Sequence, residues 1–265
     1  RLYRAVRERR LASSVTAFNY TPDELGVFVV HAAATAERSR AASNAVWDEV
    51  RRAREGEITE VEVERARRVL EAQWLRRLET MEGQASHLAS WELLGDWRAG
   101  TLYLERLLGT GAEQLAEVAS RYLTPERAGL VAYLPAKAPA LARSASEMLD
   151  ALDAVPTEPI AALMRPQRNT PVAGSRAWSL EREEAQVSVF RTSAGIPVLV
   201  QRRPGAVAHV GWFVRGGAVN ERPGEAGLTT LMTRTALKGT DRRSAQRIAE
   251  DAEFVGGVLS TSVNA

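Results

Sequence analysis

The chain has 265 residues, of which 45% are hydrophobic and 26% are charged, a composition typical of a globular protein with ample core-forming residues. Its 35 basic and 33 acidic residues leave a formal net charge of +2 and are interleaved, so the sequence gives no reason to expect a nucleic-acid partner. The absence of cysteine excludes disulfides, cysteine nucleophiles and thiolate metal sites, and leaves the compartment open.

The first 35 residues predict a short helix followed by an antiparallel hairpin. Apolar residues at helical spacing favour a helix over about residues 1–10. Residues 11–20 alternate apolar and small polar side chains and residues 26–35 are largely apolar, which predicts two strands. The turn residues Thr21, Pro22 and Asp23 lie between them.

Helices dominate the next hundred residues. We expect them over about 38–54, 59–81, 87–97 and 110–122, with a short helical turn over 101–108. Thr59 followed by Glu62 has the spacing of a capping box at a helix start. Gly83 is interpreted as the helix-breaking residue that ends this helix. A strand is predicted over 128–134. Residues 1–134 therefore read as an α+β module with helices packed on an antiparallel sheet.

A change of composition follows. Residues 135–185 are rich in alanine and proline and are predicted to be an interdomain linker with one short helix over 144–152; a proline-rich ligand for another domain is the alternative. Beyond it we expect strands over 187–191, 198–202, 211–215 and 258–265, a helix over 227–239 and a helix that begins at Ser244.

Histidines and tryptophans are interpreted as structural residues. His31, His87 and His209 are scattered, with no second histidine or carboxylate at ligand spacing, so a zinc site built from this chain alone is not expected. The tryptophans at 47, 74, 91 and 97 are expected to anchor the core or the contacts between helices rather than to line a ligand-binding site.

The stretch over residues 211–240 resembles a known signature. Gly216, Gly217, Ala218, Glu221, Gly227, Leu228, Lys238, Gly239 and Thr240 are similar to the signature of the pitrilysin/insulinase (M16) family of zinc metallopeptidases. In that register the H-x-x-E-H zinc motif falls on Thr230, Thr233 and Arg234. Two histidines one helical turn apart normally bind the metal and the glutamate polarises its water. Threonine and arginine cannot replace them, so the resemblance implies an inactive copy with no catalytic or metal residue.

The start of the chain resembles a later part of the same family's module. Leu2, Tyr3, Val6, Arg7, Glu8, Leu11, Ala12, Ser14, Val15 and Ala17 match its pattern, and 56–67 resembles a further structural segment. The family's arginine and a following tyrosine contact substrate backbone, which makes Arg7 and Ser13 candidate substrate contacts by resemblance, although Ser13 replaces the tyrosine. A surface arginine at a helix end is the alternative for Arg7.

The resemblance implies a fold of two-layer modules, LuxS/MPP-like, with an antiparallel-rich sheet packed by helices. Residues 1–134 correspond to the C-terminal part of one module, 135–185 to the linker, and 186–265 to a truncated N-terminal part of the next, inactive module. We expect the chain to be part of a longer protein, because it begins without methionine.

By resemblance, the parent is a zinc metalloendopeptidase that cleaves peptides or unfolded polypeptide in a clamshell chamber, to which this segment contributes wall, linker and substrate contacts. Zinc is expected in the upstream half and no cofactor in this segment. The implied partners are the peptide substrate and the missing catalytic half, with self-association through the unfinished sheet. No nucleic acid and no membrane span are expected. The alternative is a structural or peptide-binding scaffold whose parent has no catalysis.

Overall fold

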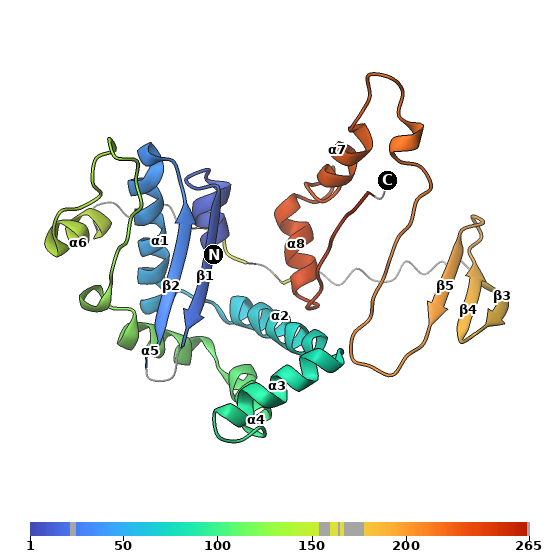
Figure 1. Cartoon of the computed structure of the whole chain (residues 1–265), viewed down its shortest axis with the longest axis horizontal. Helices are drawn as coiled ribbons and strands as arrows, with labels where there is room; N and C mark the ends of the chain where they lie inside the picture. Colours follow the sequence, from blue (N-terminus) through green and yellow to red (C-terminus); the bar gives the residue numbers. More distant parts are fainter. Residues whose placement is uncertain (22–24, 154–159, 164, 167–177, 264–265) are drawn as a thin grey trace. The chain divides into compact units, whose positions relative to one another are not determined.

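The computed structural model describes residues 1–21, 25–153, 160–163, 165–166 and 178–263 (Figure 1). It has an α+β fold with helices and small antiparallel sheets, as predicted. Contacts divide the chain into two compact units. The first unit comprises Arg1–Glu64 and Arg106–Met164, and the second comprises Arg65–Glu105 and Arg165–Ala265. The domain boundaries at 134 and 185 stay a prediction.

The first unit is built around a hairpin. The π-helix η1 (Tyr3–Glu8) leads into β1 (Ser14–Tyr20), which pairs antiparallel with β2 (Val27–Ala33). The expected short helix and hairpin are therefore confirmed. The turn residues at 22–24 lie outside the described part of the chain.

Helix α1 (Ser39–Arg54) packs on this hairpin and on η1 (Figure 1). Their shared core consists of small residues that let the backbones approach closely: Ala5, Val6, Ala12, Ala42 and Ala45. The 3-10 helix η2 (Ala36–Arg38) connects β2 to α1. This arrangement places the end of η1, the start of β1 and the end of β2 side by side.

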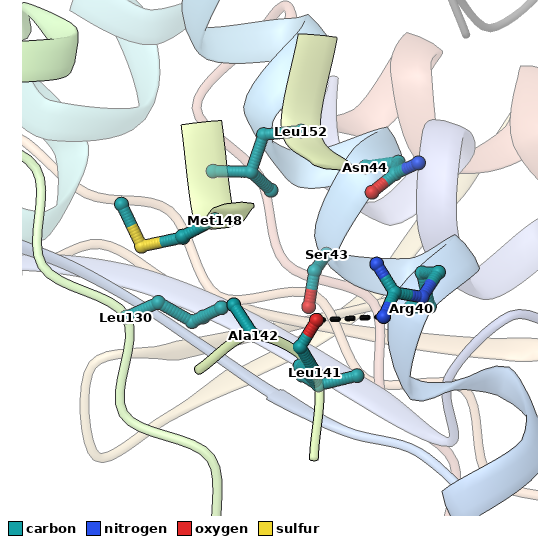
Figure 2. A pocket seen from close by; sticks show the side chains of 8 residues that line it. All are labelled: Arg40, Ser43, Asn44, Leu130, Leu141, Ala142, Met148 and Leu152. Carbon is teal, nitrogen blue, oxygen red and sulfur yellow. Dashed lines mark hydrogen bonds between the residues drawn. The ribbon is translucent and has the colours of Figure 1, made fainter. Parts of the chain in front are cut away.

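Two further helices cover α1: α5 (Ala112–Tyr122) and α6 (Ala145–Asp153), the latter being the short helix predicted inside the linker. Arg40 of α1 donates a hydrogen bond to the carbonyl oxygen of Leu141, 2.6 Å away (Figure 2). The cavity beside this bond, lined in part by Met148 and Leu152, has a volume of about 10 Å³. Only a single water fits such a space, so we interpret it as a packing gap between α1, α6 and the loop before α6 and not as a ligand pocket.

Ring contacts between residues of the second unit join the helices α2 (Glu60–Leu78), α3 (Met81–Leu93) and α4 (Ala99–Gly109), whose residues 60–64 and 106–109 belong to the first unit. His87 of α3 lies 4.9 Å from Trp74 of α2 between ring centroids, and Trp91 lies 5.3 Å from Tyr103 of α4. Trp74 and Trp91 are thus interhelix anchors, as expected. The helix predicted over 87–97 is displaced, since α3 begins at Met81 and ends at Leu93, and the short helical turn predicted over 101–108 is the longer helix α4.

The remainder of the second unit contains a meander and two helices. The strands β3 (Ser179–Glu184), β4 (Val187–Arg191) and β5 (Pro197–Gln201) form one antiparallel sheet, and β3 is a strand that the linker prediction missed. Helices α7 (Leu228–Thr235) and α8 (Ala245–Glu253) follow, the first after the 3-10 helix η4 (Ala218–Asn220). A further 3-10 helix, η3 (Pro125–Arg127), follows α5 in the first unit.

Three of the predicted strands are not strands in the described residues, so these predictions were wrong. Segments 128–134, 211–215 and 258–263 join no sheet, and the last two residues of the third prediction lie outside the description. Their apolar side chains are exposed: Val131 by 97%, Trp212 by 77% and Phe213 by 94%. Apolar alternation favours a strand only where a partner strand is available to complete the ladder. Here the described strands pair only with one another.

Candidate functional site

An open groove lies in the first unit where η1 leads into β1 and β2 leads into η2. Its volume is about 650 Å³. The lining residues come from those two junctions: Tyr3, Arg7, Glu8, Arg10, Leu11, Ala12, Ser13, Ala33, Ala34, Thr35 and Arg38. Both candidate substrate contacts, Arg7 and Ser13, are among them, so the fold brings the two predicted residues to one place.

Hydrogen bonds fix the guanidinium group of Arg7. Its Nε donates to the carbonyl oxygen of Ser13 at 2.8 Å, and one Nη donates to the hydroxyl of Tyr3 at 2.7 Å. The guanidinium carbon also lies 5.3 Å from the centre of the Tyr3 ring, within the range of a cation–π contact. The Ser13 hydroxyl donates to the carbonyl of Ala33 at 3.0 Å, which ties β1 to β2. Whether Arg7 and Ser13 touch a substrate stays a prediction.

Arg10 and Arg38 were not singled out from the sequence, yet both line the groove. Arg10 has a φ of 60°, in the left-handed region that non-glycine residues rarely adopt, and this turn brings η1 round toward β1. Arg38 holds the turn by donating to the carbonyl oxygen of Arg10 at 2.6 Å. Neither the left-handed turn nor the approach of η2 has a local signature in the sequence, so sequence reasoning had no signal for this pair.

The residues at the zinc-motif positions lie on α7 in the second unit. Thr233 donates its hydroxyl proton to the carbonyl of Thr229 at 2.8 Å, so this side chain is used within its own helix. Thr230 and Arg234 occupy the other two zinc-motif positions, and the side chain of Arg234 is exposed. A hydroxyl, a hydroxyl and a guanidinium do not form a zinc donor set. The residues present at these three positions therefore do not fit the metal.

Glu221 caps the same helix. Its carboxylate accepts hydrogen bonds from the backbone N–H of Gly227 and of Thr229, both at 2.7 Å. The N–H groups at a helix start have no partner inside the helix, and a carboxylate there also complements the helix dipole. The hydrogen bonds from Thr229 and then Gly227 hold the pKa of Glu221 below its ordinary value of 4.5.

This cap predicts acid-sensitive helicity in α7. Because the pKa is lowered in the fold, the carboxylate stabilises the folded segment fully above pH 4.5, and this contribution is lost as the pH falls through the lower folded pKa. We expect the Glu221 carboxyl carbon to titrate below 4.5 by NMR, together with the amide shifts of Gly227 and Thr229. Glu221→Gln should abolish that coupled titration. Glu225→Gln removes a carboxylate from the same loop and should preserve it.

The three histidines occupy separate environments. His31 lies in β2 opposite Thr16, and His209 lies 3.4 Å from a carboxylate oxygen of Glu79. His87 belongs to the ring cluster of the second unit. Among the described residues, no group of three or more histidine, cysteine, aspartate or glutamate side chains has the arrangement to hold a metal ion. Within the same residues, no helix combines the length and apolarity needed to cross a membrane.

Comparisons with known proteins match the two ends of the chain to one family. Residues 1–70 match the model of the peptidase M16 inactive domain, and residues 197–265 match the model of insulinase, peptidase family M16. Together these matches cover about half of the chain. The groove lies in the first matched segment and α7 in the second.

Two curated relatives agree with this assignment. The chain is 29% identical over 102 residues to the probable mitochondrial-processing peptidase subunit alpha-2, chloroplastic/mitochondrial, of Arabidopsis thaliana, covering 37% of this chain and 20% of the relative. It is 30% identical over 82 residues to the mitochondrial-processing peptidase subunit alpha of Solanum tuberosum, covering 31% of this chain and 16% of the relative. The chain thus spans a fifth or less of these relatives. No solved structure gives a significant match. The chain belongs to the M16 peptidase family.

Proposed function

We propose that this chain is a non-catalytic, peptide-binding segment of a zinc metalloendopeptidase. The groove at Arg7 is the observation that carries the proposal. A peptide in extended conformation presents carbonyl oxygens, and a guanidinium whose position is fixed by Tyr3 and Ser13 still has N–H groups to donate to them. The match of residues 1–70 to an inactive domain supports binding without chemistry.

The parent protein is proposed to hold zinc in a module upstream of Arg1. The residues at 230, 233 and 234 do not fit the metal, so any hydrolysis requires another module. The relatives are named as subunits of a peptidase, which supports a partner half for this chain. In this arrangement the segment forms wall and linker of a peptide chamber. A scaffold parent without catalysis is the alternative, and an H-x-x-E-H motif with bound zinc in the parent distinguishes the two.

Peptide binding by the isolated chain tests the proposal. We expect a fluorescently labelled unstructured peptide to bind, measured by anisotropy, and to be recovered intact by mass spectrometry. Arg7→Ala should weaken binding by about tenfold or more, because hydrogen bonds to charged groups are worth about 1.5–3 kcal/mol. Arg4→Ala is the matched control: Arg4 belongs to the same π-helix but donates to Ala161 and does not line the groove. Equal loss in both variants, or no binding at all, contradicts the proposal.

A further inference from the structure

We propose that the groove selects peptides with acidic side chains. This inference rests on the proposed peptide binding and adds the substrate class. Arg7, Arg10 and Arg38 line the groove, and Glu8 is the one carboxylate among its lining residues. The excess of positive charge in one open groove contrasts with the near balance of charge over the whole chain.

These three arginines differ from Arg1 and Arg52 of the same unit in their partners. Arg1 pairs with Glu49 at 2.8 Å, and Arg52 pairs with Asp48 at 2.9 Å. The hydrogen bonds of Arg7 and Arg38, by contrast, go to carbonyl oxygens and to a hydroxyl. No described carboxylate forms an ion pair with Arg7, Arg10 or Arg38. The neighbouring carboxylate of Glu37 offsets part of the charge of Arg38, and its pKa is lowered by hydrogen bonds from its own backbone and from Thr35 and in smaller part by that arginine.

The remaining walls favour an extended peptide over a small anion. Leu11, Ala12, Ala33 and Ala34 supply an apolar surface along the groove, and its volume of about 650 Å³ holds several residues. A ligand that matches both properties carries carboxylates for the arginines and apolar side chains between them. Because the groove is open, each ion pair is solvent-exposed and contributes a factor of up to about five at low salt. Three such pairs predict selectivity of roughly tenfold or more over a neutral peptide.

The test compares three labelled peptides of equal length and apolar content with net negative, zero and positive charge. We expect the acidic peptide to bind roughly tenfold more tightly than the neutral one at low salt and the basic peptide to bind most weakly. High salt should reduce the difference, because it screens exposed charges. In the double variant Arg10→Asn with Arg38→Gln, the acidic-to-neutral ratio should fall severalfold. Asparagine tolerates the left-handed φ of Arg10, and glutamine retains a donor for the carbonyl of residue 10.

A control of equal charge change uses Arg121→Asn with Arg127→Gln. Both arginines lie over the ring of Tyr122, outside the groove, so the selectivity should persist. Equal binding of acidic and neutral peptides, or preference for the basic one, overturns the inference while peptide binding itself stands. Loss of selectivity in both double variants assigns it to net charge and also overturns it. Failure of every peptide to bind refutes the proposed function together with the inference.

Discussion

Arg52→Met is expected to lower the free energy of unfolding of the first unit by about 3–5 kcal/mol, the range for breaking a buried ion pair. Arg52 is 3% exposed in the last turn of α1, the helix that packs on the hairpin. Its guanidinium lies 2.9 Å from Asp48 and 3.0 Å from Glu49, both of which are also buried. Methionine removes the charge that lies between the two buried carboxylates. Asp48 is then left with Arg51 as an ion-pair partner, and Glu49 is left with Arg1.

Arg51→Met is the matched control. Arg51 is the preceding residue of α1 and also pairs with Asp48, at 2.6 Å, but its own side chain is 32% exposed and that of its second partner, Glu55, is 48% exposed. Exposed ion pairs contribute about 1 kcal/mol or less, so this variant should lose no more than that. Amide hydrogen exchange of α1 in both variants measures the difference within the unit itself. Losses of similar size would show that burial does not distinguish the two arginines.

Local rules account for most of the helices. The Thr59–Glu62 capping box is present, with the amide of Thr59 donating to Glu62 at 2.9 Å and the amide of Glu62 donating back to Thr59 at 3.3 Å. The hairpin follows similarly from alternation and a turn between adjacent strands. These features depend on residues close in sequence, which is why the sequence alone predicts them.

Non-local pairing explains the failures. A segment such as 211–215 is apolar at its centre, as β4 is, but a ladder depends on a partner strand that the local sequence does not specify. The residues of the candidate site also fall into those that a local motif identifies and those that only the tertiary fold brings there. Arg7 and Ser13 were found by resemblance within one short motif, whereas Arg38 reaches the groove only because β2 returns beside β1. The assignment of 230, 233 and 234 likewise depends on family register and not on any local physical signal.

Gly83→Ala is expected to destabilise the second unit by about 1–3 kcal/mol, the cost of overpacking a close contact. The sequence suggested that Gly83 ends a helix, but it lies in the first turn of α3, where its amide donates to the hydroxyl of the cap residue Thr80 at 3.0 Å. A Cβ at this position would overlap the carbonyl oxygen of Arg77 in α2 and lie 2.9 Å from the Thr80 hydroxyl. Because Arg77 contributes backbone, the overlap cannot be relieved by a side-chain rotation.

Gly109→Ala is the control, because the same substitution at this position is not expected to lower the stability. Gly109 is the last residue of α4, and a Cβ there would meet nothing within 4 Å. Alanine favours helix over glycine by up to about 1 kcal/mol, so this variant should be as stable as the parent or more stable. Urea unfolding of both variants measures whether each substitution lowers or raises the free energy of unfolding.

The ring protons of His87 give a second, local readout of the α2–α3 corner. Their chemical shifts depend on the indole of Trp74, whose centroid lies 4.9 Å away across that corner. Displacement of α2 in Gly83→Ala should move these shifts, and Gly109→Ala should leave them in place. If Gly83→Ala changed neither the stability nor the His87 shifts, residue 83 could not lie as close to the carbonyl oxygen of Arg77 as the structure places it.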